Sequence, residues 1–193
     1  TKIIMIKFHF TFDKTKKSQK LRKIILKKYV NSTPKKSDVI VVAGGDGFML
    51  NNLKKYLKFK KPFYGINCGT YGFLMNRYVS DNLENKILNA KKTVINPLQI
   101  SSSSNKIYLR NLIAVNEISL FRQTKQTVSV KLEIGKKTLI KKLIGDGVLI
   151  STPAGSTAYN LSVHGPILSL NSGKLAITPI SPFRPRRWKG KIV

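Results

Sequence analysis

The sequence predicts two domains, an α/β domain with a parallel sheet over residues 1–95 and an all-β domain over residues 96–193. In the first half, apolar runs alternate with segments of helical period, an order typical of a parallel sheet with crossover helices. In the second half, apolar residues recur at every second position, which is typical of antiparallel strands. Glycine-rich stretches follow apolar runs in both halves. In parallel α/β sheets, ligands bind beyond the carboxyl ends of the strands.

The first predicted elements are a strand, a helix and a second strand. The apolar run at 2–8 predicts the first strand. The lysine-rich segment after it keeps roughly helical spacing at Leu21, Ile24, Ile25, Lys28 and Tyr29. The β-branched run at 38–43 then predicts a strand that is buried on both faces of a parallel sheet.

The first domain continues with a second helix, a third strand and a short third helix. The second helix follows the glycines, and its apolar spacing is kept by Leu50, Leu53 and Leu57. Residues 61–67 predict the third strand, and Asp81 is a candidate N-cap for a helix that buries Leu83, Ile87 and Leu88. This alternation is Rossmann-like.

The second half predicts loops and hairpins. Residues 96–104, with Pro97 and four serines, have a loop-like composition. Apolar and polar residues alternate over 127–134, and the sequence Gly-Lys-Lys at 135–137 can turn a hairpin. A further apolar run at 148–152 predicts another strand.

The net charge of +28 comes from 36 basic and eight acidic residues. Taken alone, it suggests nucleic acid or an anionic membrane as a partner. However, residues 1–95 carry 21 basic side chains and residues 96–193 carry 15, so no basic tail is segregated. Only seven of the basic residues are arginine, the residue that clamps phosphates and reads grooves best. We favour an AT-rich coding sequence as the source of the lysines, and nucleic acid as a partner is not expected.

The compartment is predicted from what the sequence lacks. Its apolar stretches all fall short of 18 residues, so no membrane span is expected, and we predict no membrane partner. One cysteine cannot form an internal disulfide, which suits a reducing compartment. These observations predict a cytoplasmic protein.

Scarce acids make the tetrapeptide Gly44-Gly45-Asp46-Gly47 informative. Glycines between a buried strand and a helix let the backbone approach a phosphate. The motif is neither a dinucleotide fingerprint nor a Walker A loop. An aspartate there would repel an anion unless it bound a metal or accepted a proton, and both are catalytic roles. The alternative is a β-turn in which Asp46 bonds nearby backbone.

Two further stretches carry candidate chemistry. Asn116 and Glu117 open an apolar segment and suit the hydroxyls of a sugar. Residues 145–168 hold Asp146 between two glycines and then a hydroxyl-rich loop in which Tyr159 can stack on a ring. The basic and aromatic cluster at 183–188 suits phosphate or nucleic acid, and equally a surface or subunit-contact role. Two histidines and one cysteine provide no zinc site of ordinary spacing, so we predict no metal ligands.

Taken together and in this order, the stretches GGDGFML, NCGTYGFLMN, NEISL and GDGVLISTPAGSTAYNLSVHGPIL resemble the NAD kinases. The resemblance implies an NAD site between the two domains, within a homo-oligomer that is a dimer or a tetramer. It implies phosphoryl transfer from ATP or polyphosphate to the 2′-hydroxyl of the adenosine ribose of NAD, which gives NADP. Mg²⁺ or another divalent cation would accompany ATP.

The resemblance also implies roles for individual residues. Asp46 matches the catalytic aspartate, Gly44, Gly45 and Gly47 shape the phosphate loop, and Phe73 lines the adenine pocket. Asn116 and Glu117 match the pair that contacts the dinucleotide, and Asp146 matches a carboxylate near the nicotinamide end. Asn51 matches a further polar contact. The remaining matches form a binding loop of Thr157, Ala158, Tyr159, Asn160, Leu161 and Ser162.

Members of this type continue beyond the cluster at 183–188, so the β domain is expected to be truncated at Val193. Two alternatives stay open: a related lipid or diacylglycerol kinase with the same glycine loop, and a basic nucleic-acid-binding module. Residues 145–168 favour a dinucleotide over a lipid, because they contain no apolar stripe suited to acyl chains.

Overall fold

The computed structural model describes residues 6–70, 72–78, 82–103 and 108–193. The chain divides into two compact units, Thr1–Lys92 and Thr93–Val193, which are considered separately here. The first combines helices with a parallel sheet and the second is mostly β, as predicted for the two halves of the sequence.

The first unit is built on a three-stranded parallel sheet of order β1-β2-β3, comprising β1 (Phe8–Phe12), β2 (Val39–Gly44) and β3 (Phe63–Asn67). The strands predicted at 38–43 and 61–67 are confirmed. The first strand was predicted too early, because β1 begins at Phe8, while residues 2–5 of the predicted segment lie outside the described residues. Phe8 and Phe10 are buried in this strand, so its aromatic residues form the core contact that fixes its position.

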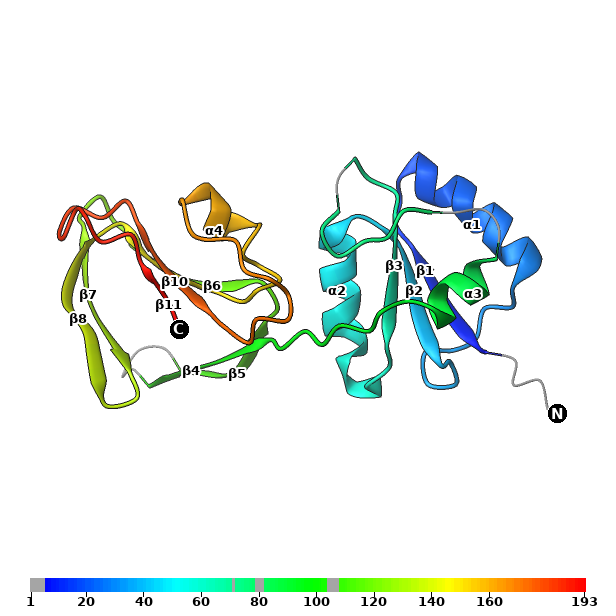
Figure 1. The fold of residues 1–193 in the computed structure, drawn as a ribbon, viewed down its shortest axis with the longest axis horizontal. Helices are drawn as coiled ribbons and strands as arrows, with labels where there is room; N and C mark the ends of the chain where they lie inside the picture. The colour runs from blue at the N-terminus through cyan, green and yellow to red at the C-terminus, as the bar shows by residue number, and fades with distance from the viewer. Residues whose placement is uncertain (1–5, 71, 79–81, 104–107) are drawn as a thin grey trace. The chain divides into compact units, whose positions relative to one another are not determined.

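Helices cover both faces of this sheet (Figure 1). They are α1 (Lys16–Lys28), α2 (Asp46–Tyr56), the short 3₁₀ turn η1 (Leu57–Phe59) and α3 (Leu83–Leu88). One face carries α1 and α3, whose Leu21, Ile25 and Leu83 pack with Val41 and Ala43. The other face carries α2, which packs on Ile40 and Val42. Alternate residues of β2 therefore serve two cores, which explains its continuous β-branched sequence.

Two details of the helices differ from the sequence prediction. The buried residues of α2 are Met49, Asn52 and Tyr56, whereas Leu57 lies beyond the helix and is exposed. The helix starts at Asp46, which turns Met49 fully onto the sheet, while the predicted Leu53 packs against the same core and is only partly buried. The N-cap of α3 is Asn82, whereas the predicted Asp81 lies outside the described part of the chain. Leu83 is buried and Ile87 packs against the same core, but the prediction for Leu88 is wrong: it is 59% exposed, because five residues of helix turn it away from the face of Leu83.

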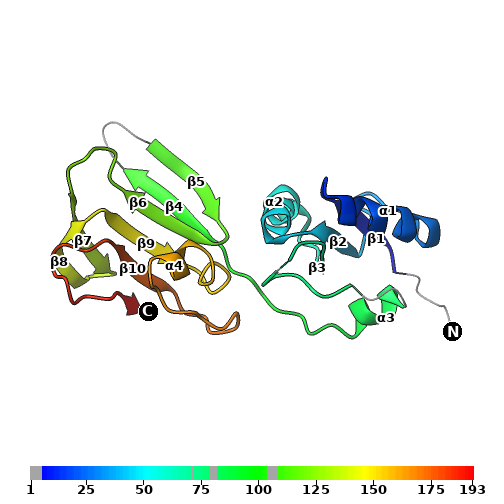
Figure 2. The same cartoon turned by 90° about the horizontal axis from the view of Figure 1, so that it is seen from above.

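Over its described residues, the second unit contains three antiparallel groups of strands (Figure 2). Its elements are β4 (Leu98–Ser103), β5 (Tyr108–Ala114), β6 (Glu117–Phe121), β7 (Val128–Ile134), β8 (Lys137–Gly145), β9 (Gly147–Ser151), α4 (Tyr159–Ser162), β10 (Ala176–Ile180) and β11 (Lys191–Ile192). The largest sheet has the order β11-β10-β9-β6, while β4 pairs with β5 and β7 pairs with β8.

The predicted hairpin is confirmed, since β7 and β8 are joined at Gly135, whose φ of 57° suits glycine. The loop predicted at 96–104 is wrong for most of its length. Leu98 and Ile100 instead pair with β5, so that the serines continue a strand. Pairing with a partner strand outweighed the low strand preference of serine.

Candidate functional site

The carboxyl ends of the three parallel strands meet at one edge of the first unit. Asp13 follows β1, Gly44 ends β2, and Cys68 follows β3. The Cys68 N–H donates to the Gly44 carbonyl at 2.8 Å, and the Asp13 N–H donates to the Ala43 carbonyl at 3.0 Å. Main-chain bonds from both neighbouring strands therefore hold the start of the glycine loop.

Asp46 lies in the first turn of α2, directly after the N-cap Gly45. Its Oδ2 accepts a hydrogen bond from the Phe73 N–H at 2.7 Å, and its Oδ1 accepts one from the Leu74 N–H at 3.0 Å. The two donors lie 27 and 28 residues further along the chain. The carboxylate therefore bonds distant backbone, and not only the nearby backbone of a local β-turn, which was the alternative interpretation of the sequence. We call this pair of bonds the Asp46 clamp. It fixes both oxygens at the edge of the sheet.

The three glycines of the loop differ in their surroundings. A Cβ on Gly44 would lie 2.8 Å from the Phe48 ring and 2.9 Å from Asp13 Oδ2, so a larger residue there would have to displace these side chains. A Cβ on Gly45 or Gly47 would meet no described atom within 4 Å. These two positions therefore leave open space beside the N-terminus of α2, where backbone N–H groups suit an anion.

Phe73 and Asn51 are the other predicted site residues of this unit. The Phe73 side chain is 43% exposed although its backbone is held by the clamp, so its ring is available to a ligand. Asn51 is exposed on α2.

In the second unit, Asn116 and Glu117 lie where β6 begins, next to the residues that follow β9. The Thr152 N–H donates to the Asn116 carbonyl at 2.9 Å, and Thr152 Oγ1 donates to the Val115 carbonyl at 2.7 Å. Thr152 Oγ1 also accepts the Gly155 N–H at 3.1 Å. A Cβ on Gly155 would overlap the Asn116 carbonyl, so the two stretches pack backbone against backbone.

Asn116 Oδ1 and Glu117 Oε2 are buried and accept no hydrogen bond from the described part of the chain. Burial raises the pKa of the Glu117 carboxyl above its ordinary value. Unsatisfied buried acceptors are costly, and native proteins seldom keep them without a reason. An unsatisfied buried acceptor suits a ligand that brings a donor, such as a sugar hydroxyl.

Asp146 lies between β8 and β9, and its side chain is engaged by Arg122. Arg122 Nε donates to Asp146 Oδ1 at 2.5 Å, in an ion pair whose side chains are 30% and 27% exposed. The flanking glycines are required by close backbones: a Cβ on Gly145 would lie 2.9 Å from the Ser181 carbonyl oxygen, and one on Gly147 would overlap that of Leu120.

The predicted binding loop divides into exposed and buried members. Tyr159 and Leu161 are 40% and 44% exposed, Ser162 is exposed, and Thr157 and Ala158 are half-buried. Asn160 is fully buried, and its amide donates to the carbonyls of Ser156 and Pro166 while its Oδ1 accepts from Thr178. Its side chain therefore holds the loop together, whereas Tyr159 and Leu161 present apolar surface.

Sequence reasoning missed three residues that shape these sites: Asp13, Arg122 and Thr152. Asp13 is one of only eight acids, and its place after the first strand would have singled it out had β1 been located correctly. Arg122 and Thr152 act through partners in distant strands, and no local pattern marks them.

Cys68 is also at the strand edge, but burial raises the pKa of its thiol, so the thiolate form is disfavoured.

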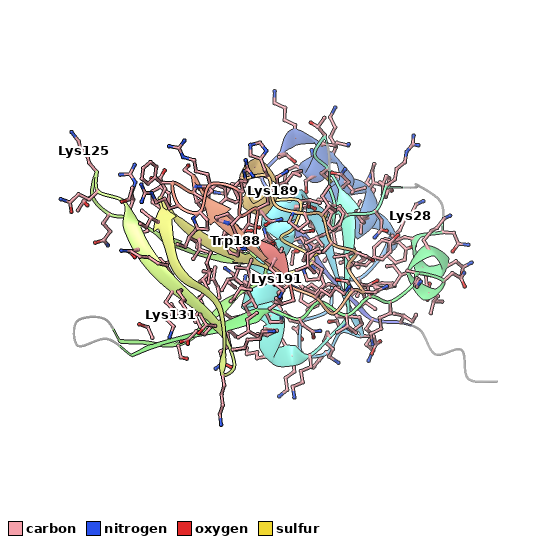
Figure 3. All side chains as sticks on the ribbon, turned by 60° about the vertical axis from the view of Figure 1, so that its left-hand side comes forward. Lys28, Lys125, Lys131, Trp188, Lys189 and Lys191 are labelled. Atoms are coloured by element: carbon pink, nitrogen blue, oxygen red, sulfur yellow. The ribbon has the colours of Figure 1, made fainter. Side chains whose placement is uncertain are left out.

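The cluster at 183–188 is partly structural. Trp188 packs against the core of Leu143, Val148 and Ile177, while Arg184 and Arg186 lie over the Phe183 ring at 5.5 and 5.3 Å. Trp188 is labelled in Figure 3. Over the described residues, His, Cys, Asp and Glu form no group of three that can hold a metal ion. No helix in that same part of the chain is long and apolar enough to cross a membrane.

The comparisons with known proteins agree for both units. Residues 2–89 match the model of the ATP-NAD kinase N-terminal domain, and residues 115–187 match that of the ATP-NAD kinase C-terminal domain. The chain is 44% identical to the NAD kinase of Brucella melitensis over 185 residues, which cover 96% of this chain and 72% of that protein. It is 45% identical to the NAD kinase of Rhizobium meliloti, with coverage of 95% and 72%.

Solved structures show the same fold. An NAD kinase from Archaeoglobus fulgidus in complex with ATP matches with a TM-score of 0.71 and 24% identity, over 97% of this chain and 77% of that one. Yeast NADH kinase complexed with NADH matches with a TM-score of 0.63 and 23% identity, over 86% and 51%. The family models, the relatives and the shared fold lead to one conclusion: the chain belongs to the NAD kinase family.

Proposed function

We propose that this chain transfers a phosphoryl group from ATP, or from polyphosphate, to the 2′-hydroxyl of the adenosine ribose of NAD, which gives NADP. The observation that carries this proposal is the Asp46 clamp, which fixes a carboxylate beside an open glycine loop at a helix N-terminus. Family membership supports the reaction and gives no support to the lipid kinase and nucleic-acid alternatives.

Asp46 is the proposed proton acceptor. Each carboxylate oxygen has two acceptor sites, and the clamp uses one on each, so either oxygen can still accept a ribose hydroxyl. A carboxylate is a much weaker base than an alkoxide. The proton therefore moves to Asp46 as the new P–O bond forms, rather than before it.

The open side of Gly45 and Gly47 is the proposed position of the donor phosphates, where the N-terminus of α2 stabilises their charge. Mg²⁺ or another divalent cation bound to ATP would neutralise charge that develops during transfer. Asp13 follows β1 and Asp46 opens α2, so two carboxylates lie at this edge of the sheet, and Mg²⁺ is commonly held by one or two carboxylates with substrate phosphates. This chain's own contribution is the fixed geometry of the loop.

NAD is proposed to contact both sets of predicted residues. The unsatisfied acceptors of Asn116 and Glu117 would receive its donors, Phe73 and Tyr159 would contact its rings, and Asp146 would lie near the nicotinamide end. Asn51 and the exposed residues of the loop 157–162 complete the proposed contacts.

Incubation of the 193-residue chain with NAD, ATP and Mg²⁺, followed by measurement of NADP, tests the proposal. We expect NADP to accumulate in proportion to enzyme concentration. A chain that is folded by circular dichroism but makes no NADP from ATP or polyphosphate would refute it.

A homo-oligomer, either a dimer or a tetramer, is proposed from the family resemblance, and size-exclusion chromatography with light scattering measures its mass.

Because NAD and ATP are metabolites of the cell interior, we also propose a cytoplasmic location. Fluorescence microscopy of the tagged full-length protein tests it.

A further inference from the structure

Arg122 and Asp146 are joined by bonds of both main chain and side chain. Arg122 follows β6, and its N–H donates to the Asp146 carbonyl at 2.9 Å. Its Nε donates to Asp146 Oδ1 at 2.5 Å, and its Nη1 donates to the Thr124 carbonyl at 2.5 Å. The guanidinium is therefore held at two points, and it fixes the rotation of the Asp146 side chain.

This ion pair differs from the other one in the described part of the chain. The Lys131–Glu133 pair is solvent-exposed, with side chains 55% and 46% exposed, so water screens it. The Arg122–Asp146 side chains are 30% and 27% exposed, and a guanidinium donates in a fixed direction. Among many lysines, an arginine supplies the bond that gives Asp146 a defined orientation.

The backbone at Asp146 is equally constrained. The Asp146 N–H donates to the Ile180 carbonyl at 3.0 Å, and the neighbouring Gly145 and Gly147 are packed against other strands. Arg122 bonds only Oδ1, and no hydrogen bond from the described residues to Oδ2 is seen. One oxygen is thus used for positioning, while the partly exposed carboxylate can still accept a donor from a ligand.

We propose that Arg122 is a positioning residue for the reaction, which orients Asp146 toward the nicotinamide end of bound NAD. The inference rests on the proposed function, in which Asp146 contacts that end of the dinucleotide. In this proposal Arg122 acts through Asp146 and not on the reacting atoms. Its loss should therefore weaken the binding of NAD and leave the phosphoryl transfer step nearly unchanged.

The exposure of the Asp146 side chain decides whether loss of Arg122 strengthens or weakens the binding of NAD. Unpairing the carboxylate would increase its attraction for the positive nicotinamide ring, but a side chain that is 27% exposed is screened by water. Loss of orientation is not screened, because a freely rotating carboxylate must be ordered again at each binding event. We therefore expect weaker binding overall.

The test compares Arg122→Gln with Asp146→Asn in the 193-residue chain. For Arg122→Gln, we expect KM for NAD to rise about tenfold, equivalent to about 1.4 kcal/mol, with kcat changed by less than about threefold. The Arg122→Lys variant, which retains a charge that can reach Oδ1, should recover part of the affinity. The double variant should be no worse than the poorer single variant, because both act through one contact.

ADP-ribose separates this role from a general effect on folding. It lacks the nicotinamide ring, so its affinity as a competitor of NAD should be the same for the wild type and for Arg122→Gln. Lys125→Gln is the matched control, because it removes a cation three residues from Arg122 that projects from the connection between β6 and β7 (Figure 3). It should change neither KM for NAD nor the affinity for ADP-ribose.

The outcomes separate the two claims. If Asp146→Asn leaves KM for NAD unchanged, the proposed contact of Asp146 fails, and the role of Arg122 fails with it, even when NADP is still formed. If Asp146→Asn raises KM but Arg122→Gln does not, only the positioning role is overturned. Equal losses of NAD and ADP-ribose binding in Arg122→Gln would also overturn it, because they would indicate a general structural defect.

Discussion

The Asp46 clamp makes a specific prediction for Asp46→Asn. An asparagine can accept one backbone N–H with its Oδ1, but it then directs its own NH₂ at the second N–H. The variant should therefore lose one charge-assisted bond, either to Phe73 or to Leu74. Such a bond contributes about 1.5–3 kcal/mol, and since Asp46 is half-buried we expect the lower end of that range.

Two measurements report the change. Thermal unfolding should show a decrease in Tm of about 3–6 °C, since about 1 kcal/mol shifts a chain of this size by 2–4 °C. Steady-state assays of NADP formation should show kcat reduced about 10²–10⁴-fold, the usual contribution of a general base. KM for NAD should rise as well, because the clamp positions Phe73.

Asp38→Asn is the matched control. Asp38 also accepts a backbone N–H, from Lys7 at 2.8 Å, but it precedes β2 at the opposite end of the strand. It should alter Tm slightly and leave kcat unchanged. A kcat for Asp46→Asn within about threefold of the wild type would remove Asp46 from its role as base. An unchanged Tm and KM would refute the structural role of the clamp.

Three further predictions follow from the packing and burial of other site residues. Gly155→Ala should push the Asn116 carbonyl away, which lowers Tm and raises KM for NAD; unchanged values would show that the loop adjusts freely. Burial raises the pKa of Glu117, so the folded state binds the proton more tightly than the unfolded one, and stability falls as pH rises above the ordinary value of 4.5. Glu117→Gln should remove that fall in pH-dependent unfolding and increase KM for NAD, whereas an identical pH profile would contradict the assignment. Phe73→Ala should raise KM for NAD with little change in Tm, because the ring is 43% exposed; a large loss of stability would mean that it belongs to the core.

The strands of the first unit were predictable where burial leaves a simple pattern. Strand β2 is buried on both faces, and its run of β-branched residues reports this directly. Strand β1 was placed too early because the apolar residues at 2–8 resemble a strand equally well. The pairing of β1 with β2, from Phe8 opposite Val39 to Phe12 opposite Ala43, fixes the register, and it joins distant parts of the sequence.

Strand β4 was missed for the opposite reason: its composition does not resemble that of a strand. Its serines have low strand preference, and their extended conformation comes from the pairing with β5. A local reading of composition therefore predicted a loop.

The candidate site was predictable in its residue types but not in its connections. The glycines around Asp46 and Asp146 indicated close backbone approach, and each motif was found from its own letters. The bonds from Phe73 to Asp46 and from Arg122 to Asp146 depend on how separate strands are arranged. Such partners become visible only when the chain is folded.

The Asp46 clamp also affects which substitutions the site can tolerate. Its donors are main-chain N–H groups, and every amino acid except proline supplies one. The side chains at positions 73 and 74 can therefore change during evolution without displacing the carboxylate. The side chains around the substrate can therefore change while the carboxylate that accepts the proton keeps its position. Proline is the one substitution that positions 73 and 74 should exclude.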